Sequence, residues 1–354
     1  MSPCEKISLQ DLDIKDYSFV KEWGYPTFRA EQIFTAAQLM KSYDEMNVPK
    51  ELKNKLSEKF FDRSVEIIEA YVGKDGTEKY LYKLNDGNIV EGVFMPHSYG
   101  NTLCVSTQVG CRMGCKFCAS TLNGLVRNLT AGEILGEVLA ANVRHGGNLK
   151  KRAITNVVLM GSGEPLDNYD EVTKFLRLLS AEKGLNMSLR NVSLSTCGLC
   201  DKIIELADSG LTVTLTISLH SPYDKRRSEI MPINNKYNVA SVIEAAKYYL
   251  KKTGRRVIFE YSLIEGENCS VRDAEKLAEL LRSMQCHVNL IRLNPVKERN
   301  LKGANKDSVK QFSDTLTQLG ISNTLRRSMG NDIEGACGQL RNKFLEERNK
   351  RADS

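Results

Sequence analysis

The sequence predicts an α/β protein whose larger part is an incomplete (β/α)6 barrel, preceded by a smaller helical and β accessory unit. Two observations support this. From about residue 100 onward, six segments rich in Val, Ile, Leu and Thr alternate with segments of helical periodicity. Repeated βα units of this kind build a parallel sheet with helices outside. Before residue 95 the pattern differs, because two helical stretches are followed by a β-hairpin.

The expected amino-terminal unit spans residues 1–95. Its first helical pattern opens at Phe28-Arg29-Ala30-Glu31-Gln32-Ile33-Phe34, and a second helical stretch follows Pro49. Two β-like segments come next, at 80–84 and 88–95. Asp86-Gly87 between them is a strong hairpin signal, because Gly readily adopts the positive φ that a tight turn needs.

The barrel is expected over residues 96–335, with residues 336–354 as a carboxyl-terminal segment. The predicted strands are 103–109, 156–160, 191–196, 213–220, 257–264 and 287–293. The predicted helices are 130–145, 170–180, 200–208, 239–252 and 271–284. Thr130 and Glu133 have the spacing of a capping box at the start of the first helix. Ligands of such folds gather at the carboxyl ends of the strands, so we expect the site there. The charged tail from Arg341 onward is expected to be a solvated helix or a frayed end.

The composition of the 354 residues is ordinary for a globular protein, with 41% hydrophobic and 27% charged residues. No apolar run is long enough to cross a membrane, and the first residues, Met1-Ser2-Pro3-Cys4, show no signal-peptide pattern. We therefore expect a cytoplasmic protein, in which ten Cys serve metal, cluster or redox roles rather than a disulfide framework. The net charge of +6 permits a nucleic-acid partner without proving one.

Cys111, Cys115 and Cys118 form a Cys-x-x-x-Cys-x-x-Cys triplet directly after the first predicted barrel strand. Three thiolates are one short of the four that usually complete a 4Fe–4S cluster. A cluster held in this way keeps one iron open for S-adenosylmethionine, and it can deliver the electron that breaks a carbon–sulfur bond. The alternative is structural zinc, which closes with four ligands. No second Cys or His pair lies at a typical zinc-finger distance, so the spacing favours a cluster.

Polar residues follow several of the predicted strands. Gly163 and Glu164 form a Gly-rich turn after one strand, and such a turn can bring backbone carbonyls close to a ligand ammonium group. Ser195, Ser218, His220 and Asn294 come at the ends of three later strands. Any one of them alone is better explained as a helix cap. Together, at one rim of the barrel, they favour a ligand pocket.

Two further thiols stand out, Cys104 just before the triplet and Cys337 in a Gly-rich segment near the carboxyl end. A thiol in an accessible loop can act as a nucleophile once ionised, but the residues alone leave a plain buried Cys equally open and do not pair Cys337 with Cys104. Cys197 and Cys200 resemble a redox pair, which we interpret as coincidence. Cys4, Cys269 and Cys286 have no convincing partners. The pairs Arg226-Arg227 and Arg326-Arg327 are candidates for phosphate contacts.

The chain resembles the RlmN/Cfr family of radical-SAM adenine methyltransferases over nearly its whole length. The resemblance rests on seven motifs, which are Phe28-Arg29-Ala30-Glu31-Gln32-Ile33-Phe34, Leu103-Cys104-Val105-Ser106-Thr107-Gln108-Val109-Gly110-Cys111, the Cys triplet, Gly163-Glu164-Pro165-Leu166, Ser218-Leu219-His220, Met231-Pro232-Ile233-Asn234 and Ala336-Cys337-Gly338-Gln339-Leu340. It implies a radical-SAM partial barrel and an amino-terminal accessory domain that helps to hold RNA. It also implies methylation of adenine C2 in 23S rRNA and in tRNA.

The resemblance also implies roles for individual residues. Cys111, Cys115 and Cys118 bind a single 4Fe–4S cluster. Cys337 receives a methyl group from one S-adenosylmethionine and carries it to adenine as a radical, Glu91 is the proton acceptor, and Cys104 releases the product and leaves a Cys104–Cys337 disulfide. The implied S-adenosylmethionine site consists of Gly163, Glu164, Ser195, Ser218, Leu219, His220 and Asn294. A flavodoxin or ferredoxin-type electron donor and a monomeric state are also expected.

Two alternatives stay open. Ser162 and Arg292 depart from the common RlmN pattern, and His220-Ser221-Pro222-Tyr223 resembles Cfr, whose members methylate adenine C8. The segment Asp75-Gly76-Thr77-Glu78-Lys79-Tyr80 resembles RlmN instead and favours C2. The alternative of another class is a non-catalytic Fe–S or zinc RNA-binding protein.

Overall fold

A ten-stranded sheet forms the centre of the protein in a computed structural model that describes residues 6–340. Seven of its strands are parallel and follow one another across the sheet in chain order. They are β6 (Thr102–Val105), β9 (Asn156–Leu159), β10 (Val192–Thr196), β11 (Thr214–Ser218), β12 (Val257–Leu263), β13 (Cys286–Arg292) and β14 (Asn323–Leu325). Because β14 and β3 end the sheet without pairing to each other, the barrel is open, which confirms the predicted incomplete barrel.

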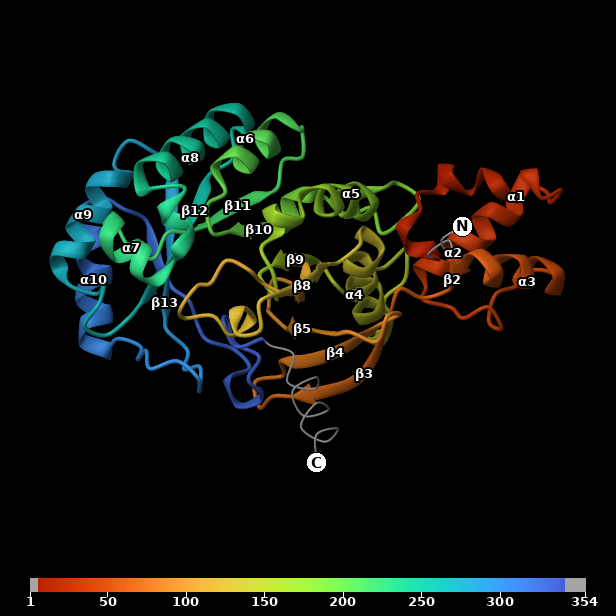
Figure 1. The fold of residues 1–354 in the computed structure, drawn as a ribbon, viewed down its shortest axis with the longest axis horizontal. Coiled ribbons are helices and arrows are strands. Elements are labelled where there is room, and N and C mark those ends of the chain that lie inside the picture. Colours follow the sequence, from red (N-terminus) through yellow and green to blue (C-terminus); the bar gives the residue numbers. More distant parts are fainter. Residues whose placement is uncertain (1–5, 341–354) are drawn as a thin grey trace.

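Helices cover the outer side of this sheet (Figure 1). They are α4 (Ala131–Arg144), α5 (Tyr169–Ser180), α6 (Cys200–Asp208), α7 (Asp224–Ile230), α8 (Val239–Thr253), α9 (Val271–Leu281) and α10 (Lys306–Gln318). The predicted capping box is present, since Thr130 Oγ1 accepts from the Glu133 N–H at 3.1 Å and Glu133 accepts from the Thr130 N–H at 2.9 Å. The apolar faces of these helices pack against the strands and form one continuous hydrophobic core.

The first predicted barrel strand, 103–109, is wrong as a single strand. β6 ends at Val105, and a separate strand, β7 (Gln108–Gly110), pairs antiparallel with β8 (Leu125–Asn128). The chain turns between them because the N–H groups of Thr107 and Gln108 donate to the Ser162 carbonyl, at 2.8 and 3.1 Å. The last predicted helix ends three residues earlier than expected, and α7, α10 and β14 were not predicted.

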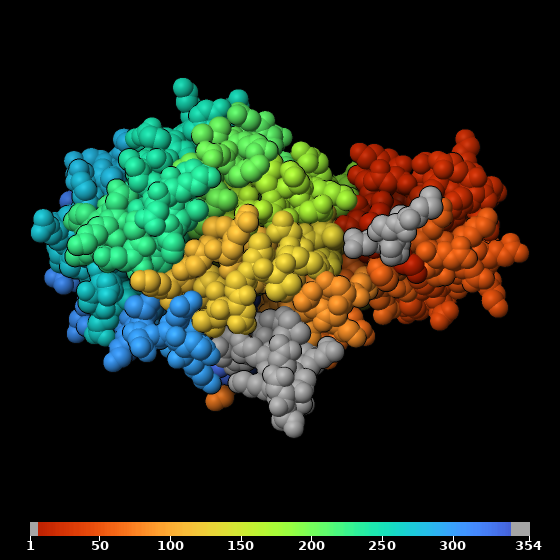
Figure 2. Space-filling model, in the orientation of Figure 1, coloured from red at the N-terminus to blue at the C-terminus, as the bar shows by residue number. Residues whose placement is uncertain are grey.

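The amino-terminal residues form two different structures. The hairpin of β4 (Glu78–Leu84) and β5 (Ile89–Met95) is confirmed, and together with β3 (Val65–Val72) it continues the barrel sheet through β5 and β6. Helices α1 (Phe19–Glu22), α2 (Phe28–Gln38) and α3 (Lys50–Lys59), with the short strands β1 (Ile7–Ser8) and β2 (Phe60–Phe61), enclose a separate core. Figure 2 shows these first residues as a lobe beside the barrel. The division into 1–95, 96–335 and 336–354 stays a prediction.

The carboxyl-terminal segment is described as far as Leu340. It is attached to the barrel by hydrogen bonds from Ala119 N–H to the Gly338 carbonyl (2.8 Å) and from Ser120 Oγ to the Leu340 carbonyl (2.9 Å). Cys4 and the charged tail from residue 341 lie outside the described residues. Among residues 6–340, no helix is long and apolar enough to span a membrane.

Candidate active site

The three cysteines of the triplet lie in a loop between β7 and β8, at the carboxyl end of the barrel. The Cys111 N–H donates to the Gly124 carbonyl at 2.9 Å, which closes the loop. A side chain at Gly110 would place its Cβ 2.0 Å from that same carbonyl oxygen, so Gly is required there. Thr121 Oγ1 donates to the carbonyls of Cys115 and Cys118, at 3.2 and 3.0 Å. Hydrogen bonds between its own residues therefore hold the loop in shape.

All three thiols line one cavity of about 140 Å³, which we call the smaller cavity. Six of the seven residues expected to bind S-adenosylmethionine share its wall, as does Cys337, and they are Gly163, Glu164, Ser195, Ser218, His220 and Asn294. The exception is Leu219, whose side chain is buried in the barrel core. Residues more than 200 positions apart thus converge as the strand-end pattern predicted.

The thiol arrangement fits a cluster better than a single ion. In the described part of the chain, no group of three or more His, Cys, Asp or Glu side chains is placed to hold one metal ion. A four-iron cube instead spreads its thiolates over separate irons, so they need to share a cavity and not a single point. Burial raises the pKa of Cys111 to about 12 and raises those of Cys115 and Cys118. Metal binding would therefore have to displace the thiol protons.

Glu164 is fixed at the Gly-rich turn after β9. Its carboxylate accepts the N–H groups of Leu166 and Cys197, at 3.0 and 2.7 Å, and burial raises its pKa. Gly163 has φ +109°, and a Cβ there would lie 2.7 Å from the Cβ of Gln108. The turn therefore packs directly on β7 and holds Glu164 beside the cluster loop.

His220 is buried and neutral at the end of β11. Its Nδ1 accepts the Ser262 N–H at 2.9 Å, so its Nε2 carries the remaining ring proton. Burial and the nearby Arg227 lower its pKa to about 3. The ring packs edge-to-face against Phe117 of the cluster loop, with centroids 4.6 Å apart. His220 therefore presents a hydrogen-bond donor at physiological pH.

Arg227 is a structural residue that the sequence reasoning misread. The side chain is fully buried and donates five hydrogen bonds, to the carbonyls of Leu219, Cys197, Ser218 and Tyr237 and to Asn234 Oδ1. The prediction that it contacts phosphate is therefore wrong. The available signal was its position three residues before Ile230 in α7, because i and i+3 share a helix face and Ile230 is buried.

Cys197 was also missed as a site residue. It follows β10 directly, is buried, and lines the smaller cavity. Glu260 on β12 lines the same cavity and forms an ion pair with Arg326 at 2.9 Å. Like Ser195 and Ser218, both lie at the carboxyl half of the sheet, which is the signal that would have found them.

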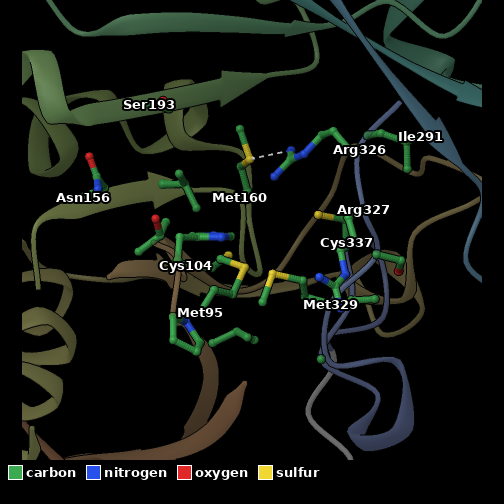
Figure 3. A pocket seen from close by; sticks show the side chains of 18 of the residues that line it. Met95, Cys104, Asn156, Met160, Ser193, Ile291, Arg326, Arg327, Met329 and Cys337 are labelled. Carbon is green, nitrogen blue, oxygen red and sulfur yellow. Dashed lines mark hydrogen bonds between the residues drawn. The ribbon is translucent and has the colours of Figure 1, made fainter. Parts of the chain in front are cut away.

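Cys104 and Cys337 line a second, larger cavity of about 680 Å³. Figure 3 shows them on different walls, Cys104 on the sheet side and Cys337 on the carboxyl-terminal segment. Asn294 Nδ2 donates to the Cys337 carbonyl at 3.1 Å and orients that segment. Cys337 is exposed to the cavity, yet the surrounding protein desolvates it and raises its pKa, while Arg326 lowers it. The pKa of the buried Cys104 is raised mainly by desolvation.

Glu91 does not reach the wall of either cavity. It is buried in β5, and its carboxylate lies 3.4 Å from Lys79 Nζ. Side chains alternate along a strand, so Glu91 shares a face with Val93 and Met95, which line the larger cavity. Glu91 therefore lies on the same face of β5 as this wall, two residues before the first β5 residue that lines the cavity.

Comparisons with known proteins identify the family. The model of the radical SAM superfamily matches residues 105–281. A probable dual-specificity RNA methyltransferase RlmN from Clostridium perfringens is 52% identical over 331 residues, covering 92% of this chain and 94% of the relative. A protein of the same description from Clostridium botulinum is 49% identical, covering 95% and 96%.

A solved structure agrees with these relatives. The crystal structure of a radical SAM methyltransferase from Sphaerobacter thermophilus superimposes with a TM-score of 0.90 at 41% identity, covering 95% of this chain and 99% of the other. The family model matches half of the chain, and the named relatives align over nearly all of it. The chain therefore belongs to the RlmN family of radical-SAM, dual-specificity RNA methyltransferases.

Proposed function

We propose that this protein methylates C2 of an adenine in 23S rRNA and in tRNA, through an S-methylcysteine at Cys337. One observation carries the proposal. Cys337 lines both cavities, so this residue lies where the cavity that holds the Cys triplet adjoins the cavity that holds Cys104. A thiol in that position can receive carbon from one side and pass it to a base on the other.

Cys111, Cys115 and Cys118 hold the 4Fe–4S cluster in this proposal, and S-adenosylmethionine lies along Gly163, Glu164, Ser195, Ser218, His220 and Asn294. When bound, the cluster supplies the electron that cleaves S-adenosylmethionine to a 5′-deoxyadenosyl radical. The fixed carboxylate of Glu164 and the neutral His220 offer an acceptor and a donor for the amino acid end of that ligand.

Cys337 first acts as a polar nucleophile. Its thiolate attacks the methyl carbon of one S-adenosylmethionine, S-adenosylhomocysteine leaves, and Cys337 becomes S-methylcysteine. The 5′-deoxyadenosyl radical from a second S-adenosylmethionine then takes a hydrogen atom from this methyl group and becomes 5′-deoxyadenosine, and the resulting methylene radical adds to C2. Adenine C2 is electron-poor and cannot attack a sulfonium methyl group, whereas a carbon radical needs no nucleophilic partner.

Release of the product requires a second thiol. The radical adduct gives up one electron, which the cluster would take back, and Glu91 accepts the C2 proton. The Cys104 thiolate then attacks the sulfur of Cys337 and breaks the bond between that sulfur and the transferred carbon, which takes up a proton and becomes the methyl group. A Cys104–Cys337 disulfide forms, and reduction returns both thiols. The shared cavity of Cys104 and Cys337 supports this step, and Glu91 lies on the same face of β5 as Val93 and Met95, which line that cavity.

RNA is the substrate class that the larger cavity favours. Arg190, Arg292 and Arg327 line it, with Asp75 as its acidic residue, and Arg side chains commonly contact phosphate. We further propose that the protein works as a cytoplasmic monomer and takes its electrons from a flavodoxin or ferredoxin-type donor.

The test is methylation of RNA by a Cys337→Ala variant. After anaerobic reconstitution with iron and sulfide, the wild type should give 2-methyladenosine in digested RNA, and Cys337→Ala should give none while keeping the visible absorption of its cluster. Cys286→Ala is the matched control, because Cys286 on β13 lines neither cavity. Full methylation by Cys337→Ala would refute the mechanism.

The same digest addresses the alternatives. Mass spectrometry against standards of 2-methyladenosine and 8-methyladenosine separates C2 from C8 chemistry, for which the Cfr-like His220-Ser221-Pro222-Tyr223 is the supporting observation. A non-catalytic binding protein would release no 5′-deoxyadenosine when S-adenosylmethionine and a reductant are added.

A further inference from the structure

The turn between β5 and β6 carries two stacked aromatic rings at the larger cavity. His97 and Tyr99 both line that cavity, with ring centroids 4.8 Å apart and planes within 8° of parallel. Tyr99 is 75% exposed. Single exposed aromatics are common on protein surfaces. This one differs because its outer ring face is free to meet a ligand while a second ring supports its inner face.

The backbone of this turn is held rigidly. The Gly100 N–H donates to the His97 carbonyl at 3.1 Å, and the Asn101 carbonyl accepts the N–H groups of Thr155 and Asn156, each at 3.0 Å. Gly100 has φ +130°, and a Cβ there would lie 2.3 Å from Thr155 Oγ1. The turn is thus fastened to the start of β9, and little conformational entropy is lost when a ligand binds to it.

The charges around the ring pair suit a nucleotide. Arg190, Arg292 and Arg327 line the same cavity and can attract phosphates. Burial and the charge of Arg326 lower the pKa of His97, so its imidazole is neutral at physiological pH. Neutral aromatic side chains beside cationic ones are the usual means of holding unstacked RNA bases.

We propose that Tyr99, supported by His97, is a stacking platform for the nucleobase next to the target adenine. The cavity of about 680 Å³ is larger than a single base needs, and Tyr99 shares it with both catalytic thiols. A neighbouring base that stacks on Tyr99 would keep the target adenine turned toward Cys337. This inference rests on the proposed RNA substrate.

Binding is measured with unmodified tRNA by fluorescence anisotropy, without reductant, in the Cys337→Ala background, which cannot turn over. Tyr99→Phe should bind like its parent, because the ring face is kept. Tyr99→Ala should bind about 5- to 150-fold more weakly, which is the loss expected for one base–aromatic stack. Tyr248→Ala is the control, since Tyr248 is an exposed tyrosine on α8 that lines neither cavity. Binding of Tyr99→Ala within twofold of its parent would overturn the proposal.

A second readout reports stacking directly. 2-Aminopurine is placed next to the mapped target adenine, on each side in turn, because its emission is quenched when it stacks. One of the two positions should be quenched by the parent protein and by Tyr99→Phe, but not by Tyr99→Ala. Equal emission with all three proteins would sink the platform. RNA binding does not need methylation. If the wild type failed to methylate RNA but binding still weakened in Tyr99→Ala, the result would count against the proposed chemistry and not against the platform.

Discussion

Arg227 should be the most costly conservative replacement in the site, because no other basic side chain can copy its contacts. The guanidinium donates five hydrogen bonds to four carbonyls and one amide oxygen. A lysine ammonium has three donors on one nitrogen. Arg227→Lys therefore leaves at least two of these five hydrogen bonds unmade.

The expected loss of stability follows from the two hydrogen bonds that Lys does not make. Each hydrogen bond from a charged donor contributes about 1.5–3 kcal/mol, so Arg227→Lys should lower the free energy of unfolding by about 3–6 kcal/mol. That is a large part of the about 5–15 kcal/mol that stabilises a typical protein. The carbonyls of Cys197 and Ser218, at the ends of β10 and β11, are among the groups that can lose their bond to residue 227. The wall of the smaller cavity then loosens as well.

The neighbouring arginine provides the control. Arg226 is about half exposed and pairs with Asp273 at 2.7 Å, and Lys can keep that pair, so Arg226→Lys should cost less than about 1 kcal/mol. Both variants are compared by urea unfolding of the cluster-free, reduced protein, followed by circular dichroism. An Arg227→Lys variant as stable as Arg226→Lys would refute the reasoning.

Two further predictions concern the turn after β9 and the end of β11. Gly163→Ala should lower the melting temperature of the cluster-free protein more than Gly24→Ala does. Both variants introduce a Cβ at positive φ, but only the Cβ at position 163 meets the Cβ of Gln108, at 2.7 Å. Equal decreases in melting temperature would show that this contact relaxes freely. His220 has its folded pKa lowered to about 3, so between about pH 6.5 and that value the unfolded chain binds a proton that the folded chain does not. The free energy of unfolding should therefore fall as pH decreases through this window, by about 1.4 kcal/mol per pH unit more than in His220→Gln. Urea unfolding at a series of pH values measures this difference, and parallel pH profiles of the two proteins would contradict a buried neutral imidazole.

Much of the fold and of the candidate site was predictable because it depends on local patterns. The triplet of Cys111, Cys115 and Cys118 is set by spacing, and the alternation of strands and helices placed Glu164 and His220 at strand ends. Parallel strands bring their carboxyl ends to one rim whatever lies between them, so these residues met in the smaller cavity.

The errors arose where nonlocal packing decides the outcome. The break after Val105 depends on the Ser162 carbonyl, which accepts two N–H groups from a turn more than fifty residues earlier in the chain. The burial of Arg227 depends on carbonyls from three other segments. Hydrophobic periodicity carries no information on either contact, since it reports only which face of an element is apolar.

By itself, the sequence determined that three thiols stand close together, because Cys111 and Cys118 are only seven residues apart in the chain. Only the tertiary structure decided that Cys104 and Cys337, more than 230 residues apart, face one cavity. That meeting depends on Asn294, Ala119 and Ser120, whose hydrogen bonds fold the carboxyl-terminal segment back across the barrel. Contacts of this length are set by how packed elements close on one another, which spacing along the chain does not encode.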